Sequence, residues 1–332
     1  MLRAVKGSAP PFRVGVVGVG VMGSNHARVI SELPEVELAG IVDIDRHQAR
    51  NVSRSVGCRA FENLDALLEC GVEATTIAAP THLHHDLAIT CIRRGIHVLI
   101  EKPIASTAEE GRSLIAAARR AGVTLMVGHV ERFNPAVQAI KETLVGEEIL
   151  SIAITRVGPF PPRMSNVGVV IDLAVHDIDL IRWFTDSEII EMQPQLSSAV
   201  AEREDIALLQ FRTASGVLAH INTNWLTPFK ARTAHVATRK KYVMGDLLTR
   251  QVTECFGFKA DGSYSMRHLP VGYAEPLRAE LQAFIEAIRC GTAPAVSGEE
   301  GVASLDIAMR CLAGRADTGP VAPRKLARRV VG

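Results

Sequence analysis

The stretch Arg13-Val-Gly-Val-Val-Gly-Val-Gly-Val-Met-Gly23 decides the fold, because an apolar run of strand length breaks there into a glycine-rich turn. The glycines are Gly18, Gly20 and Gly23, and a helical pattern follows over residues 25–33. In the spacing G-x-G-x-x-G the first glycine permits a tight turn, the second lets the backbone approach a pyrophosphate, and the third lets helix and strand pack closely. The stretch therefore predicts a Rossmann-type dinucleotide site; a glycine-rich turn without a dinucleotide is the alternative.

An acid follows the second apolar run. Val36–Val42 ends in Asp43, 20 residues after Gly23, where a carboxylate accepts hydrogen bonds from the ribose hydroxyls and repels a 2′-phosphate. The free N–H groups at the start of the following helix would face the phosphates. Val21 and Met22, within the glycine-rich turn, are predicted cofactor contacts. The sequence thus predicts a nicotinamide cofactor, NAD in preference to NADP. Arg46 weakens this preference, because an arginine just past the acid can bind the 2′-phosphate of NADP.

The bulk composition is that of an ordinary globular protein. The chain has 332 residues, enough for two domains, with 47% hydrophobic and 22% charged residues. A net charge of +1 gives no case for nucleic acid or a membrane surface as partner, and no apolar stretch is long enough to span a membrane. The six scattered cysteines contain no C-x-x-C, so we expect reduced thiols in the cytoplasm and no zinc or disulfide framework.

Strand and helix patterns alternate from Phe12 to Gly128, which indicates a parallel sheet with crossover helices. After Gly128 the sequence predicts a helix over residues 135–144, a strand over 149–157 and a helix over about 169–184. Several strand patterns then follow one another without helices between them, which indicates an antiparallel sheet. These patterns cover residues 205–212, 217–226, 231–237 and 241–255, before helical patterns at 277–290 and 298–312. The predicted fold is an α/β Rossmann domain over residues 1–128, with a flexible tail at 1–11, and an α+β domain over 129–332 with one large, mostly antiparallel sheet.

Lys102 is the first candidate for chemistry. It follows the apolar strand Ile96–Ile100 directly, between Glu101 and Pro103, at the carboxyl edge where doubly wound sheets bind ligands. There it could donate a hydrogen bond to a substrate hydroxyl or take its proton. The alternative is a solvated loop lysine.

The second candidate is the pair Asp172 and His176, four residues apart in a predicted helix over residues 169–184. Positions i and i+4 share one helix face, so both side chains can act on one pocket. A histidine titrates near neutrality and suits a general base. A structural histidine beside an aspartate is the alternative.

The segment Thr81–Asp86 contains three histidines and resembles a metal site at first sight. The chain offers no cysteine or H-E-x-x-H pattern to complete such a site, so no metal is predicted. The segment follows a predicted strand over residues 74–79 and Pro80, and we expect Thr81 to cap a helix that begins near the cofactor. One of the histidines would then be structural.

Five motifs follow one another along the chain in this order: G-V-G-V-M-G, A-A-P-T-H-L-H-H, E-K-P, G-H-V-E-R-F-N-P and D-L-A-V-H-D-I-D. By these motifs the chain resembles the Gfo/Idh/MocA oxidoreductases over nearly its whole length. The resemblance implies that Lys102 and His176 flank the nicotinamide and the oxidised carbinol, and that Asp172 helps to place the sugar. It also implies cofactor contacts from Pro80, His84, Glu101 and Lys102, and a substrate contact from Asn134. Ala174 departs from the family, where many members carry glycine.

Within the family, the segments R-V-G-P-F-P-P-R and N-T-N-W are most similar to UDP-N-acetylglucosamine 3-dehydrogenases. These enzymes make a 3-keto sugar nucleotide that an aminotransferase carries toward a diamino sugar for lipid A. Arg156 and Arg163 could bind the diphosphate, or could be surface charges. The family resemblance also implies a homodimer or homotetramer formed through the outer face of the second sheet. An inositol or UDP-sugar-acid dehydrogenase and a non-catalytic dinucleotide-binding regulator are the alternatives, and either Lys102 or His176 could be the base.

Overall fold

The computed structural model describes residues 10–161 and 167–314. Its N-terminal part contains a parallel six-stranded sheet in the order β3-β2-β1-β4-β5-β6, the Rossmann order. The strands are β1 (Phe12–Val17), β2 (Val36–Val42), β3 (Ala60–Phe61), β4 (Ala74–Ile77), β5 (His97–Glu101) and β6 (Leu125–Gly128). The predicted parallel sheet is confirmed, and the glycine turn lies between β1 and the first helix at its centre.

Helices connect these strands. They are α1 (Val21–Ser31), α2 (Arg46–Val56), α3 (Leu64–Glu69), η1 (Thr81–Leu83), α4 (His84–Arg93) and α5 (Ala108–Ala121). Asp45 and Thr107 cap α2 and α5 by accepting hydrogen bonds from backbone N–H groups. The prediction that Thr81 caps the helix after β4 was wrong. The segment begins as the short 3-10 turn η1, and no side chain caps either η1 or α4.

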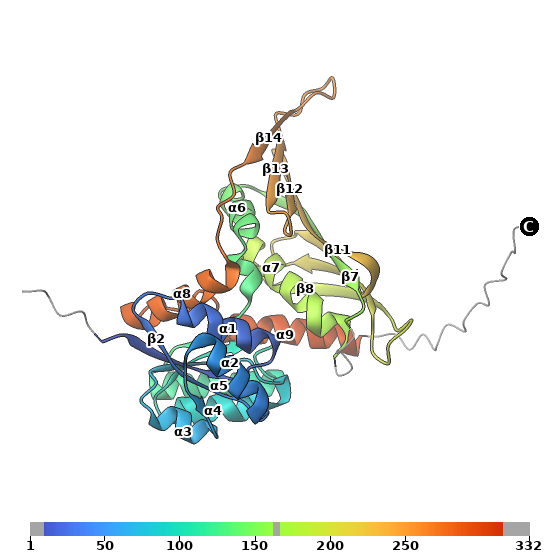
Figure 1. Cartoon of the computed structure of the whole chain (residues 1–332). Coiled ribbons are helices and arrows are strands. Elements are labelled where there is room, and N and C mark those ends of the chain that lie inside the picture. The colour runs from blue at the N-terminus through green and yellow to red at the C-terminus, as the bar shows by residue number, and fades with distance from the viewer. Residues whose placement is uncertain (1–9, 162–166, 315–332) are drawn as a thin grey trace, which may run out of the picture.

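The C-terminal part contains an eight-stranded sheet in the order β14-β13-β12-β11-β7-β10-β9-β8. All of its pairings are antiparallel except that of β7 with β10, so the predicted mostly antiparallel sheet is confirmed. The strands are β7 (Ile149–Pro159), β8 (Ile189–Ser197), β9 (Ile206–Thr213), β10 (Leu218–Asn224), β11 (Leu226–Thr238), β12 (Lys241–Asp246), β13 (Gln251–Phe256) and β14 (Ser265–Leu269). Figure 1 shows β13 and β14 extending away from the Rossmann part as an arm.

Three helical segments pack against this sheet: α6 (Pro135–Thr143) contacts β12 and β13, η3 (Val170–Ala174) contacts β10, and α7 (Val175–Thr185) contacts β7. The short turn η2 (Val130–Phe133) precedes α6, and its residues Val130 and Phe133 pack against the core of the parallel sheet. The sequence predicts a single helix over residues 169–184, but the structure has two consecutive segments there. The π-helical turn η3 comes first and continues directly into the α-helix α7. Insertions of this kind often occur at functional sites.

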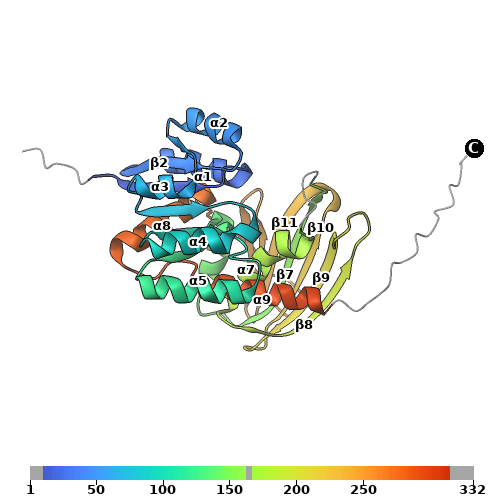
Figure 2. The same ribbon diagram turned by 90° about the horizontal axis from the view of Figure 1, so that it is seen from below.

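The last two helices, α8 (Pro276–Cys290) and α9 (Gly298–Ala313), return to the Rossmann part. Buried residues of α8, including Leu281 and Phe284, belong to the same hydrophobic core as the parallel sheet. Helix α9 contacts α5 on one side and α7 and β8 on the other, and both figures show it between the two sheets (Figures 1 and 2). The N-terminal core is thus completed from beyond residue 128. Within the described ranges, no helix is both long and apolar enough to cross a membrane.

Candidate functional site

The glycine turn has the shape that a pyrophosphate requires. Gly18 adopts φ +82°, and a Cβ there would lie 2.8 Å from the backbone nitrogen of Ala79. A Cβ on Gly23 would lie 1.8 Å from the carbonyl oxygen of Gly18, so α1 packs against the turn only without a side chain. A Cβ on Gly20 would meet nothing within 4 Å, and no side chain caps α1. The open space at Gly20, in front of a helix N-terminus, fits a dinucleotide phosphate.

Two apolar side chains beside this space are exposed to an unusual degree. Val21 is 73% exposed and Met22 is 37% exposed, although α1 buries its opposite face. Asp43, at the end of β2, accepts hydrogen bonds from the backbone N–H groups of Val19 (2.6 Å) and Asp45 (2.8 Å). Its carboxylate therefore joins the glycine turn to the start of α2, and its remaining lone pairs are those that a ribose would use.

Replacing Asp43 tests the choice between NAD and NADP. In Asp43→Asn and Asp43→Ala the affinity for NAD should fall about 10-fold to 100-fold, equivalent to the ~1.5–3 kcal/mol of hydrogen bonds to a charged group. The affinity for NADP should fall less, because the carboxylate no longer repels the 2′-phosphate. Fluorescence titration of both dinucleotides measures the two constants. Equal affinities in the unmodified protein would contradict the assignment.

Lys102 lies at the carboxyl end of β5 and reaches across to the second part of the chain. Its ammonium donates hydrogen bonds to the Asp172 carbonyl oxygen at 2.6 Å and to Asp172 Oδ1 at 3.4 Å. The side chains of Lys102 and Asp172 are 17% and 24% exposed, so both are accessible but partly desolvated. These contacts argue against the alternative of a solvated loop lysine, and η3 supplies the carbonyl that orients the ammonium.

His176 lies in the first turn of α7, within the electrostatic range of Lys102. Desolvation, followed by the positive charges of Lys102 and Arg156, lowers the pKa of His176 well below its usual 6.5. Its Nδ1 is buried and has no hydrogen-bond partner among the described residues. The ring is therefore neutral at physiological pH, and a neutral imidazole can accept a proton.

A buried layer of charges lies next to His176. Arg156, 2% exposed, donates from Nε and Nη2 to Asp177 at 2.7–3.0 Å and from Nη1 to Glu131 Oε1 at 2.7 Å. Although burial acts against it, these two carboxylates raise the pKa of Arg156. Arg232, 35% exposed, donates to the same oxygen of Glu131 at 2.9 Å. Arg156 is committed to this network, so the structure argues against its predicted contact with a diphosphate.

A second buried ion pair supports the same helix. Arg132 donates to both oxygens of Asp179 at 2.7 Å and to Glu300 of α9 at 2.6 Å. His129 Nδ1 lies 3.9 Å from Asp179, and the rings of His129 and His176 meet edge to face at 6.1 Å between centroids. Helix α7 is thus held from two sides by arginines, which fixes where His176 can lie. The sequence analysis gave Arg132, Asp177 and Asp179 no role, and gave Arg156 a different one, the contact with a diphosphate.

The remaining predicted site residues have different surroundings. Asn134 is buried and caps α6, and it also donates to the Leu247 carbonyl oxygen, so its side chain serves the local fold. His84 is buried between the carbonyl oxygens of Ala79 (2.8 Å) and Pro103 (2.9 Å) and joins the loops after β4 and β5. Arg163 lies outside the described residues.

A cavity of about 510 Å³ opens beside these two loops. Pro80 and His82 line it from the β4 side, Pro103 from the β5 side, and Ile171 from η3. It adjoins the loop that carries Lys102, through Pro103, and η3, which carries Asp172, but Lys102, Asp172 and His176 themselves do not line it. Arg203 also lines this cavity, and it is an exposed cation that the sequence analysis did not single out.

Comparison with known proteins identifies the chain's relatives. Residues 12–129 match the Gfo/Idh/MocA oxidoreductase family with an NAD-binding Rossmann fold, and residues 138–243 match the family's C-terminal domain. The UDP-N-acetylglucosamine 3-dehydrogenase of Acidithiobacillus ferrooxidans is 31% identical over 83% of this chain and 88% of its own. Its solved structure has a TM-score of 0.86 and covers 91% of this chain and 97% of its own, at 27% identity. An inositol 2-dehydrogenase of Rubrobacter xylanophilus is also 31% identical, over 93% of this chain and 92% of its own.

Proposed function

Because this chain belongs to the Gfo/Idh/MocA family of NAD-binding oxidoreductases, we propose that it oxidises a secondary alcohol of a sugar nucleotide. The proposed substrate is UDP-N-acetylglucosamine and the proposed product is its 3-keto derivative. The observation that carries the proposal is the hydrogen-bonded pair of Lys102 and Asp172 at the carboxyl end of β5, with a neutral His176 within electrostatic range of Lys102. A ketone made there is a substrate for an aminotransferase, the proposed next step.

The residues have separate tasks in this proposal. The Lys102 ammonium, held by the Asp172 carbonyl, donates a hydrogen bond to the reacting hydroxyl. His176, neutral and fixed by the charged layer, accepts the hydroxyl proton. NAD, when bound at Gly18–Gly23 and Asp43, supplies the hydride acceptor. Orientation of the hydroxyl between the two side chains is the protein's contribution.

Two features favour a sugar nucleotide as substrate. The UDP-N-acetylglucosamine 3-dehydrogenase of Acidithiobacillus ferrooxidans resembles the chain in both sequence and fold. The 510 Å³ cavity beside the Lys102 loop, with Arg203 in its lining, suits a ligand longer than a free polyol. An inositol is the second candidate, because an inositol 2-dehydrogenase is equally identical to the chain.

A substrate panel distinguishes these candidates. The purified protein and NAD are mixed with UDP-N-acetylglucosamine, other UDP-sugars, UDP-sugar acids, myo-inositol and scyllo-inositol, and NADH absorbance is followed. We expect the highest kcat/KM with UDP-N-acetylglucosamine and a product two mass units lighter that an aminotransferase accepts. A higher kcat/KM with an inositol would replace the proposed substrate. NAD binding without turnover of any compound would favour the regulatory alternative.

The pH profile tests the neutral histidine. A general base works only when unprotonated, so kcat/KM should fall as pH drops through the pKa of His176. Because burial and Lys102 lower that pKa, the fall should lie below pH 6.5, the ordinary value of the ring. Initial rates between pH 4.5 and pH 9 at saturating NAD measure the curve. An acidic limb at or above the ordinary pKa would show that another group controls the rate.

A further inference from the structure

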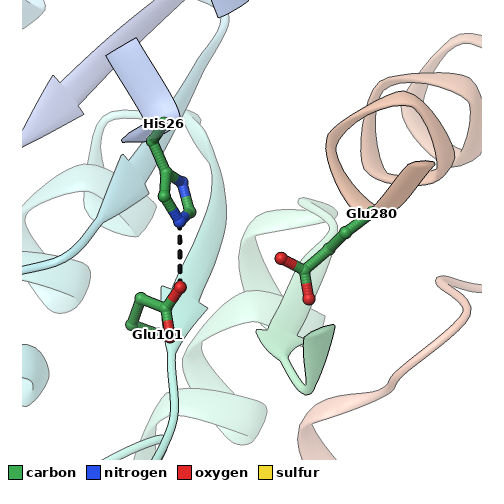
Figure 3. A group of neighbouring side chains, drawn as sticks. All are labelled: His26, Glu101 and Glu280. Carbon is green, nitrogen blue, oxygen red and sulfur yellow. Dashed lines mark hydrogen bonds and ion pairs between the residues drawn. The ribbon is translucent and has the colours of Figure 1, made fainter. Parts of the chain in front are cut away.

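Three ionisable side chains meet behind the Glu101–Lys102 peptide. Figure 3 shows His26 of α1, Glu101 at the end of β5 and Glu280 of α8 directed toward one another. One nitrogen or oxygen atom from each side chain lies within 4.8 Å of those of the other two. His26 and Glu280 are 0% exposed and Glu101 is 7% exposed, so the cluster is shielded from solvent.

The three side chains differ in how many hydrogen-bond partners they have. Glu101 bonds to His26 Nε2 at 2.9 Å through one oxygen and accepts the backbone N–H of Lys102 at 3.2 Å through the other. Both oxygens of Glu280 are buried without a hydrogen-bond partner in the described part of the chain. A bare carboxylate in that position, next to a second carboxylate, would be strongly unfavourable. A proton on Glu280 removes the charge and gives the group a donor.

The charged groups around Glu280 indicate where the proton resides. His26 faces the cluster from α1, Glu101 and Lys102 from the end of β5, and His129 lies nearby before η2. Burial, and then the negative charge of Glu101, raise the pKa of Glu280 well above the usual carboxyl value. Although burial opposes it, His26 and Lys102 hold the pKa of Glu101 below the usual value. One carboxyl group is therefore ionised and the other is neutral.

We propose that Glu280 is a positioning residue for the active-site lysine, a neutral acid within 4.8 Å of Glu101 whose proton is directed toward the Glu101 carboxylate. Glu101 in turn holds the backbone N–H of Lys102, so α8 fixes the peptide from which Lys102 extends toward Asp172. The expected effect of Glu280 on turnover rests on the proposed function, in which Lys102 contacts the reacting hydroxyl. The protonation state of Glu280 does not depend on that role, and it can be measured separately.

Infrared spectroscopy tests the proton directly. A protonated carboxyl group has a C=O stretching band that a carboxylate lacks. In the NAD-saturated protein at neutral pH, Glu280→Gln should remove one such band, and the band should shift in D₂O. Glu286→Gln, an exposed acid on the same helix, should leave the spectrum unchanged in this region. No lost band in Glu280→Gln would overturn the proposal. So would a stoichiometric divalent cation detected by mass spectrometry and a melting temperature lowered by a chelator, because the cluster would then be a metal site.

The temperature of unfolding provides a second readout. In the unfolded chain Glu280 loses its proton near the usual carboxyl pKa, whereas in the folded chain it keeps the proton to higher pH. The unfolded state therefore binds fewer protons in this interval, and the wild-type protein loses stability as pH rises. Glutamine cannot ionise, so the melting temperature of Glu280→Gln should exceed that of the wild type increasingly from about pH 5 upward. A difference that does not vary with pH would contradict a protonated Glu280.

Kinetics test the positioning role. Glu280→Gln keeps a donor of the same shape and should retain kcat within a few-fold of the wild type. Glu280→Leu removes the donor, and kcat should fall about tenfold or more, the effect of one hydrogen bond to a charged group, with little change in KM. If Glu280→Leu does not fold, the infrared and melting experiments on Glu280→Gln still decide the protonation. Equal kcat in folded Glu280→Leu and the wild type would overturn the positioning role.

Discussion

Lys102→Ala and His176→Ala should each lower kcat on the order of 10²-fold or more, as expected for groups that hold or accept the reacting proton. The double variant should lose much less than the product of the two single losses, because the residues act on one hydroxyl as a unit. NAD affinity should change little, since the proposed pyrophosphate and ribose contacts lie at Gly18–Gly23 and Asp43. Steady-state kinetics with the best compound of the substrate panel, together with NAD titration, measure these effects.

The pH profiles of the single variants assign the base. The acidic limb should disappear in His176→Ala and persist in Lys102→Ala. Lys240→Ala, at an exposed turn between β11 and β12, is the matched control and should leave both kcat and KM unchanged. A folded His176→Ala protein with nearly full turnover would make the histidine structural and leave the proton to Lys102.

Arg156→Ala should lower the free energy of unfolding of the protein, and its effect should not be confined to substrate binding. The change leaves Asp177 and Glu131 buried without their common partner, and breaking a buried ion pair in this way costs about 3–5 kcal/mol. Because the same network lies against His176, kcat should fall as well. Urea unfolding at neutral pH, combined with kinetics in the absence of urea, separates the two effects.

Arg212→Ala is the control for this prediction. Arg212 also pairs with a carboxylate, Glu191, but both side chains are about half exposed or more, so the change should cost at most about 1 kcal/mol. An Arg156→Ala protein of unchanged stability, with only a raised KM for a sugar nucleotide, would restore the diphosphate role first predicted from the sequence.

The glycine turn, the parallel sheet and the acid after β2 were predictable because each depends on residues close together in sequence. The two strands that sequence analysis missed, β8 and β14, are the edges of the large sheet. Edge strands are exposed on one side and tolerate residues that a central strand excludes, such as Pro194 in β8. Their patterns are therefore the weakest in the chain.

The buried position of Arg156 could have been predicted from the alternation of side chains along its strand. In β7 the side chains alternate between faces, and Arg156 is in phase with the buried residues Ile152 and Ile154. An arginine in a core-facing position requires carboxylate partners, and the acids beside His176 were available. By contrast, no local pattern could show that Glu280 meets His26 and Glu101, because helix, strand and helix come together only in the folded chain.

The packing of α8 against the parallel sheet has a consequence for synthesis. The last strand of that sheet, β6, ends at Gly128, but Leu281 and Phe284, at most 1% exposed, complete its core much later in the chain. At 5–20 residues per second, the ribosome needs roughly 8 to 30 s to supply them. Throughout that interval the nascent Rossmann sheet lacks the α8 side chains that complete its core, and an exposed apolar surface of this kind is what chaperones recognise.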